Sequence, residues 1–289
     1  MDRGITLCRA AIAAAVMITT CPAARAGTWR RDLEIRGTVA GVLGRGRINV
    51  FLPSAYAARK ASPFRLLIVL HGWRGHGHDW ERNSPLSHYA DKHRYVVVAP
   101  HMGTTVYERS YYPETRGRYR WGAIPGGRWI GEVVLPHVRR RYNVSKAGHG
   151  TGIFGLSTGG RGAALLPAYY PGSFGAFAAL SADYDITMDP REPTATHIYG
   201  LYARFPERWK RDNSRFLLDR LRKVPALLIH GGRDRVCQPE QSRLFAAELG
   251  RRGYDVTHIE DPNLGHDWKL WSGYLGAVFD FFDDKLRAR

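Results

Sequence analysis

The feature that most constrains the fold is a series of short, continuously apolar runs separated by segments long enough to form helices. Residues 65–70 (RLLIVL) and 95–99 (YVVVA) are two such runs, and the polar segment 79–94 between them can form a helix. A run without polar residues is typical of a strand buried on both faces, as in parallel sheets covered by helices. Further strands are expected at residues 47–52, 153–156, 176–180, 226–229 and 255–259. This alternation predicts an α/β fold with a mostly parallel central sheet flanked by helices.

The segments between these strands have different characters. Helical spacing of apolar residues predicts helices at residues 129–142, 159–170, 240–252 and 274–287. Residues 103–129 are rich in Tyr, Arg and Gly without a regular period, which predicts a long functional loop. Residues 183–222 are polar, aromatic and charged, so we expect a small cap or insertion over the sheet edge.

The N-terminus has the features of a cleavable secretory signal peptide. Arg3 and Arg9 precede a short apolar run, and Ala24-Arg25-Ala26 supplies small residues for cleavage. We therefore expect residues 1–26 to be removed and residues 27–289 to form one catalytic domain, secreted or periplasmic and without a transmembrane segment. Cys8 and Cys21 would leave with the signal, so Cys237 would have no disulfide partner within the chain.

The charge of the chain is strongly positive. It has 43 Lys+Arg and 26 Asp+Glu, a net charge of +17, and loss of residues 1–26 would leave +15. The arginines are dispersed and no helix-turn-helix, zinc-finger or single-strand-binding pattern accompanies them, so we expect no nucleic-acid partner. A field of this sign attracts anionic surfaces, such as acidic polysaccharide or membrane lipid, and weakens with salt.

A candidate nucleophile lies where an expected strand meets an expected helix. The residues Gly155-Leu156-Ser157-Thr158-Gly159 match G-x-S-x-G, in which small flanking residues let a serine hydroxyl stand exposed above a parallel sheet. A serine hydroxyl needs a base and an orienting carboxylate, in the chain order Ser, Asp or Glu, His. Asp234 follows the strand at 226–229, and His266 follows the next helix and strand. We therefore predict a catalytic triad of Ser157, Asp234 and His266.

An oxyanion formed at Ser157 would need preorganised N–H donors. One is expected from the residue after the nucleophile, Thr158, and one from the first strand-to-helix loop, His71-Gly72-Trp73-Arg74-Gly75. We predict that the backbone amides of Trp73 and Thr158 form the oxyanion hole.

Four segments together carry a family resemblance: LHGWRGHGHDW, GLSTGGRGAALLPAYYPGSFGAFAALSADYD, HGGRDRV and NLGHDW. They resemble, in order, the serine-esterase family of α/β-hydrolases. That family includes feruloyl and acetylxylan esterases, enterochelin esterases, S-formylglutathione hydrolases and mycolyltransferases. The resemblance implies an α/β-hydrolase fold and gives Ser157, Asp234, His266, Trp73 and Thr158 the same roles as above. Thr158 departs from the methionine often found there, which matters little for a backbone amide.

The expected function is hydrolysis of a carboxylic ester, small or linked to polysaccharide, through an acyl-enzyme. One alternative is an acyltransferase that uses the same triad, and another is a non-catalytic binding protein with this fold. Added alcohol acceptors would reveal the first, and labelling of Ser157 by a fluorophosphonate would exclude the second.

Three other groups of residues compete for a role. His71, His76 and His78 lie close to Asp79, but their spacing fits no established zinc motif. A serine triad needs no metal, so we expect neither a metal nor a cofactor. Asp183, Asp185 and Asp189 lack EF-hand spacing and are interpreted as a solvated or substrate-side loop. The aromatic segments 107–129 and 199–209 can stack on sugar or phenolic groups, or pack internally.

Overall fold

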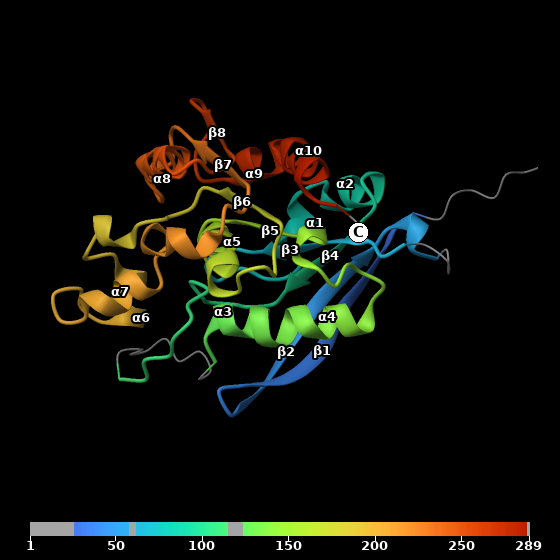
Figure 1. Cartoon of the computed structure of the whole chain (residues 1–289), viewed down its shortest axis with the longest axis horizontal. Coiled ribbons are helices and arrows are strands. Elements are labelled where there is room, and N and C mark those ends of the chain that lie inside the picture. Colours follow the sequence, from blue (N-terminus) through green and yellow to red (C-terminus); the bar gives the residue numbers. More distant parts are fainter. Residues whose placement is uncertain (1–25, 58–61, 115–123, 288–289) are drawn as a thin grey trace, which may run out of the picture.

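The computed structural model of the chain describes residues 26–57, 62–114 and 124–287. The predicted signal peptide therefore lies, except for Ala26, outside the described residues. The sheet has eight strands in the order β1-β2-β4-β3-β5-β6-β7-β8 (Figure 1). The pairs β1–β2 and β2–β4 are antiparallel, and all later neighbours are parallel. The predicted mostly parallel sheet is confirmed.

The strands have the following bounds: β1 Thr28–Val39, β2 Val42–Leu52, β3 Arg65–Leu70, β4 Tyr95–Pro100, β5 Thr151–Leu156, β6 Ala176–Leu180, β7 Ala226–Gly231 and β8 Val256–Asp261. The α-helices are α1 Asp79–Asn83, α2 Leu86–Lys92, α3 Gly126–Trp129, α4 Leu135–Arg141, α5 Thr158–Tyr169, α6 Pro193–Tyr199, α7 Pro206–Arg211, α8 Pro239–Arg251, α9 Trp268–Gly273 and α10 Leu275–Lys285. Short 3₁₀ segments are η1 Ser54–Ala57, η3 Gly148–Gly150, η4 Ile186–Met188 and η5 Ser214–Leu221, and η2 Ile130–Val134 is a π-helical turn.

Helices cover both faces of the sheet. The alternate residues of β3 show why the strands of this sheet are mostly apolar. Leu66, Ile68 and Leu70 pack on the face that α4, α5 and α8 cover. Leu67 and Val69 pack on the opposite face, under α1, α2, α9 and α10. Since side chains of a strand alternate between faces, a strand between two helical layers favours an apolar residue at nearly every position.

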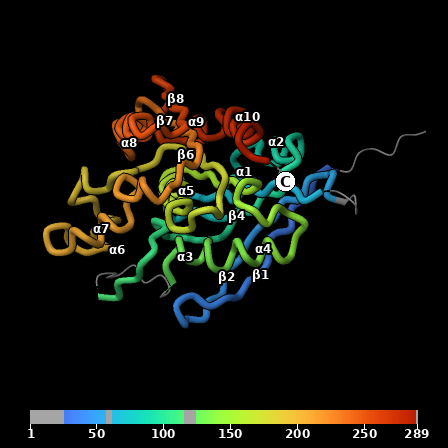
Figure 2. Tube along the Cα trace, in the orientation of Figure 1, coloured from blue at the N-terminus to red at the C-terminus, as the bar shows by residue number. Residues whose placement is uncertain are grey.

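The expected cap is present between β6 and β7 as η4, α6, α7 and η5. Figure 2 shows α6 and α7 projecting at the left, on the side away from α10. Ile198, Tyr199 and Trp209 of the cap are buried against Val106 and Tyr112 of the loop that follows β4. These aromatic rings therefore pack internally, which was one of the two roles expected for them.

Several element boundaries differ from the sequence expectation. The single helix expected at 79–94 is two helices, α1 and α2, because Pro85 interrupts it. The helix expected from residue 129 begins at Gly126, which shortens the long loop, and it passes through the π-helical turn η2. The closing helix expected at 274–287 spans Leu275–Lys285 and is preceded by α9.

The sequence analysis missed the strand β1, which forms a hairpin with β2. Val39 pairs with Val42, so the loop is the two residues Ala40 and Gly41, with φ of 49° and 81°. Positive φ at both positions is the turn that suits the right-handed twist of paired strands. In the part of the chain that is described, no helix is long and apolar enough to cross a membrane.

The junction between β5 and α5 leaves no room for side chains at two glycines. A Cβ on Gly155 would lie 2.5 Å from the backbone carbon and oxygen of Gly159 and 2.8 Å from the Leu70 oxygen. A Cβ on Gly159 would lie 2.5 Å from the His71 oxygen. Because these neighbours are backbone atoms of packed elements, they cannot move aside without shifting β3 or α5.

We predict that Gly155→Ala lowers the free energy of unfolding by about 3 kcal/mol, the upper end of the usual cost of overpacking a core. The matched control is Gly250→Ala on the exposed side of α8, where nothing lies within 4 Å of the new Cβ. That change is expected to stabilise the protein by about 0.5–1 kcal/mol, because alanine is the better helix former. Urea unfolding of both variants measures the difference, and equal midpoints would contradict the prediction.

Candidate active site

Ser157 occupies a strained turn between β5 and α5. Its φ of 54° and ψ of −125° lie outside the regions that a non-glycine residue normally adopts. The turn is held by a hydrogen bond from its N–H to the Leu180 oxygen at 2.8 Å and by one from the Arg161 N–H to the Ser157 oxygen at 3.0 Å. Strain of this kind persists only where the surroundings impose it, and a strand-to-helix turn of this shape exposes the serine oxygen.

Asp234 and His266 come together at the same sheet edge, beyond the carboxyl ends of β7 and β8. His266 Nδ1 lies 2.7 Å from Asp234 Oδ2. An ionised carboxylate only accepts hydrogen bonds, so the His266 proton on Nδ1 is the donor, which leaves Nε2 as the free lone pair. The Asp234 side chain is fully buried and that of His266 is 13% exposed. The order of the parallel strands thus places this pair on the edge where Ser157 lies.

The surroundings of Asp234 keep its carboxyl group ionised. Burial alone would raise the pKa, but hydrogen bonds from His230 and His266 outweigh burial and hold the pKa of Asp234 well below its usual value. Oδ1 also accepts the N–H groups of Val236 and Cys237 at 2.8 and 2.9 Å. A buried carboxylate with this many donors is a fixed negative charge beside the imidazole.

His230 is a neighbour of this pair that the sequence analysis did not single out. Its side chain is fully buried, with Nε2 2.9 Å from the Cys237 oxygen and 3.3 Å from Asp234 Oδ2. Nδ1 lies 2.6 Å from Ser242 Oγ. His230 therefore fixes the loop in which Asp234 lies, and a polar residue ending an otherwise apolar strand is the sequence signal for it.

Ser157, Thr158 and Trp73 line one cavity of about 180 Å³. Thr158 is the first residue of α5, and Trp73 follows β3. The apolar wall comes partly from the cap and includes Ile186 and Ala195. The structure therefore brings the predicted nucleophile and both residues of the predicted oxyanion hole to the same cavity.

Charged groups also line this cavity, and Arg161 is the largest. Arg161 is 2% exposed, and its Nη2 donates to the Asp212 backbone oxygen. Its Nε and Nη1 have no hydrogen-bond partner within the described residues. Burial raises the pKa of Asp183, and its carboxyl group accepts a hydrogen bond from the Cys237 thiol at 3.5 Å. The position of Arg161, four residues after Ser157 and so on the next turn of α5, is the signal that could have identified it.

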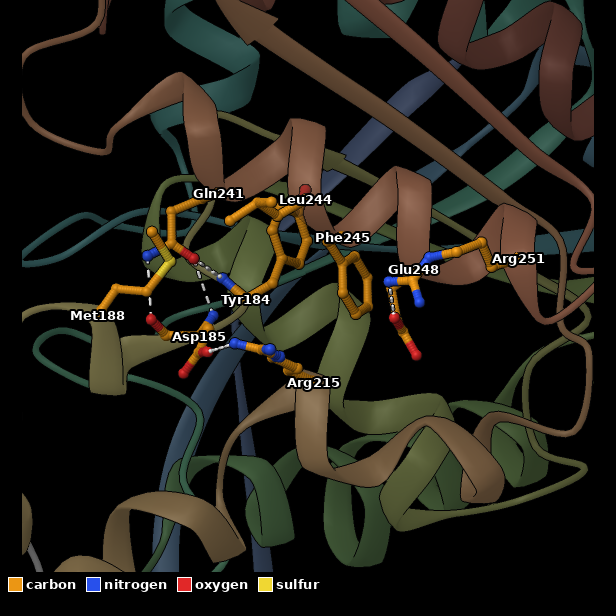
Figure 3. Close-up of a pocket in the computed structure, with 9 residues that line it drawn as sticks. All are labelled: Tyr184, Asp185, Met188, Arg215, Gln241, Leu244, Phe245, Glu248 and Arg251. Atoms are coloured by element: carbon orange, nitrogen blue, oxygen red, sulfur yellow. Dashed lines mark hydrogen bonds and ion pairs between the residues drawn. The ribbon is translucent and has the colours of Figure 1, made fainter.

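Asp185 supports the cap rather than facing this cavity. It is buried and binds Arg215, and Gln241 accepts the N–H groups of Tyr184 and Asp185 at 3.1 and 2.9 Å. Figure 3 shows these residues around a second, smaller cavity, where the Tyr184 ring stacks on Phe245 of α8. Asp189 has a different role from Asp183 and Asp185. It is exposed, and its carboxylate accepts the Arg191 N–H and so caps its own turn.

The structure divides the histidine group of the sequence analysis. His71 is buried and fixes backbone, with Nδ1 2.7 Å from the Gly72 oxygen and Nε2 2.9 Å from the Met102 N–H. Asp79 accepts the His76 N–H. His76 and His78 instead lie beside a histidine from another loop, His101.

The chain is similar to several known proteins. An acetyl esterase of Caldicellulosiruptor saccharolyticus is 25% identical over 232 residues, covering 75% of this chain and 82% of the relative. FphF, a fluorophosphonate-binding serine hydrolase of Staphylococcus aureus, matches with a TM-score of 0.71 at 18% identity, over 89% of this chain and 99% of that chain. MPT51 (FbpC1) of Mycobacterium tuberculosis matches with a TM-score of 0.70 at 15% identity, over 90% and 99% of the two chains.

These structural likenesses confirm the predicted α/β-hydrolase fold. The family model described as "Putative esterase" matches residues 43–276, which is most of the chain. The chain therefore belongs to this esterase family, as its four motifs predicted.

Proposed function

We propose that this carboxylic ester hydrolase works through an acyl-enzyme on Ser157, with His266 as the base and Asp234 as the orienting carboxylate. The observation that carries the proposal is the Asp234–His266 hydrogen bond of 2.7 Å at the sheet edge where Ser157 lies in its strained turn. Family membership supports ester hydrolysis in general. The assignment of individual residues rests on the geometry.

Each residue has a defined step in the proposed reaction. The free Nε2 of His266 takes the Ser157 proton as the serine oxygen attacks the ester carbonyl. Asp234 then stabilises the imidazolium, because it is an ionised carboxylate in contact with Nδ1. The amides of Trp73 and Thr158 bind the oxyanion, and His266 returns the proton to the leaving alcohol. Water repeats the sequence on the acyl-enzyme and releases the acid.

The cavity favours a short acyl group. Its volume of about 180 Å³ lies below the roughly 300–1,000 Å³ of common ligand pockets. One relative bears the name acetyl esterase, which agrees with such a substrate.

Replacing the nucleophile is the first test. Ser157→Ala is expected to lower kcat on p-nitrophenyl acetate about 10⁶-fold, since the variant lacks the attacking oxygen. It should also abolish labelling by a fluorophosphonate. Ser272→Ala on α9 is the matched control and should keep both properties.

An active or labelled Ser157→Ala variant would exclude Ser157 as the nucleophile. A folded wild-type protein that cleaves no ester but transfers acyl groups to added alcohols would favour the acyltransferase. Neither activity nor labelling would favour the binding protein.

Replacing the carboxylate tests the role of Asp234. Asp234→Asn is expected to lower kcat about 10⁴-fold, because an amide can donate to His266 Nδ1 and favour the wrong tautomer. The control, Asp219→Asn, removes one charge from a side chain that is 94% exposed and should leave kcat unchanged. Equal kcat values for Asp234→Asn and wild type would refute the role.

The same variant has a predicted effect on stability against pH. The pKa of Asp234 is lower in the folded protein than in the unfolded chain, so ionised Asp234 stabilises the fold above the unfolded value, about 3.9, and less as the pH falls below it. Asp234→Asn removes this dependence. Its Tm is therefore expected to fall less than that of wild type between about pH 5 and pH 3. Parallel melting curves would contradict this.

We also propose that the chain is exported and cleaved after Ala26. In support, the Gly27 nitrogen lies 3.3 Å from Asp91 Oδ2, so cleavage there would create an α-ammonium group beside a carboxylate. We predict that protein recovered from periplasm or medium begins at Gly27, which mass spectrometry of the intact chain measures. Recovery of the uncleaved chain in the cytoplasm alone would refute export.

A further inference from the structure

A cluster of three histidines lies outside the proposed active site. His76 and His78 come from the loop after β3, and His101 follows β4, the neighbouring strand. One ring nitrogen from each lies within 4.8 Å of the other two. His76 Nε2 and His101 Nδ1 are 3.1 Å apart. This separation is close to the roughly 3.3 Å expected between two nitrogens that bind one zinc ion at about 2.0–2.1 Å in a tetrahedron.

The surrounding polar groups orient two of these rings. Asn49 Oδ1 lies 3.0 Å from His101 Nε2, so that nitrogen carries the proton and Nδ1 presents a lone pair towards His76. Asp32 Oδ1 lies 3.3 Å from His78 Nε2 and accepts a hydrogen bond from it. Outer carboxylate and amide partners of this kind fix the tautomers of metal-bound histidines.

Carboxylates also lie close to the cluster. The Asp32 carboxylate lies 3.3 Å from His78 Nε2 and contributes negative charge, whereas the Glu81 carboxylate, 3.6 Å from His78 Nδ1, is paired with Arg31. His76 is exposed, which leaves the cluster open to solvent.

We propose that His76, His78 and His101 bind one divalent transition-metal ion, with Zn²⁺ as the best match to three imidazoles. The ion would lie between His76 Nε2 and His101 Nδ1 in place of the proton that they share, and His76 would then carry its proton on Nδ1. His78 holds hydrogen bonds at both ring nitrogens, so it would exchange one of them for the ion. Water or the Asp32 carboxylate would complete a tetrahedron.

The site would join two loops near the proposed active site. Gly75 and Gly103 already form an isolated bridge between these loops. A metal on His76 and His101 would cross-link the same two loops, and Trp73 belongs to the first of them. Binding would therefore limit motion of the Trp73 amide. The importance of this effect for catalysis rests on the proposed function, whereas metal binding itself does not.

The test is a titration of the protein, prepared without a histidine tag, with Zn²⁺ in a calorimeter. We expect one ion per chain with micromolar or tighter affinity, a raised Tm, and with Co²⁺ the visible absorption of a tetrahedral complex. His76→Gln and His101→Gln should each lower the affinity at least about 100-fold, more than loss of an outer partner costs. His76 is exposed, so its variant is expected to fold.

The matched control is His88→Gln, which removes an exposed histidine of α2 and should bind Zn²⁺ as wild type does. Absence of saturable binding to wild type would overturn the proposal, as would equal affinities of His76→Gln, His101→Gln and His88→Gln. Ser157→Ala should bind Zn²⁺ like wild type, so an error in the proposed catalytic mechanism would not be mistaken for an error here.

Discussion

The backbone contact between the β5–α5 turn and the end of β3 is the constraint on which the rest of the site depends. Gly159 lies so close to the oxygens of Leu70 and His71 that a side chain there would displace β3. The end of β3 is held from the other side as well, since Tyr107 donates its hydroxyl to the His71 oxygen at 2.9 Å. With both elements locked, Ser157 and the loop carrying Trp73 can only meet at one cavity. The positive φ of Ser157 is stabilised by this packing, because the turn has no freedom to relax.

A second constraint is the burial of charge at the same edge of the sheet. Asp234 is stable as an anion only because four donors surround it, and two of them are backbone N–H groups of its own loop. Arg161 is a buried cation near three acidic residues. Asp183 and Glu192 line the cavity with it, and the backbone oxygen of Asp212 accepts a hydrogen bond from its guanidinium. Burial raises the pKa of Asp212 to about 6, so this second carboxyl group ionises less readily than that of Asp234. The site thus separates one fixed negative charge, beside His266, from a mixed charged wall that faces the cavity.

Local sequence predicted those elements whose cause is local. Strands β3 and β6 agree with the expected 65–70 and 176–180 residue for residue, because burial on both faces makes every position apolar except Arg65 at the start of β3. Strand β1, and with it the hairpin to β2, was missed because only one face of β1 is buried, at residues such as Ile35, and because the turn uses Ala40-Gly41 rather than the Asn-Gly or Asp-Gly that identifies such turns.

The residues of the candidate site can be divided in the same way, into those that local sequence identifies and those that it does not. Ser157, Asp234 and His266 could be proposed because a strand end or a motif identifies each position, whereas Arg161, His230 and His101 were not singled out. The contacts of Arg161 and His101 depend on packing between distant segments: Arg161 reaches a residue 51 positions away, and His101 reaches His76 across 25 positions. Neither spacing is a motif, so only the tertiary fold brings the groups together.

The loop after β3 connects the two polar centres of the molecule. Its first residues include Trp73, which lines the same cavity as Ser157, and its later residues, His76 and His78, lie beside His101. The Gly75–Gly103 bridge lies between them, and the His76 N–H donates a hydrogen bond to the Asp79 carboxylate. A metal ion on the histidines, as proposed, would hold the far end of this short segment. Preorganised donors stabilise an oxyanion because they need no reorientation during the reaction, and a loop held at both ends would meet that requirement for the proposed Trp73 donor.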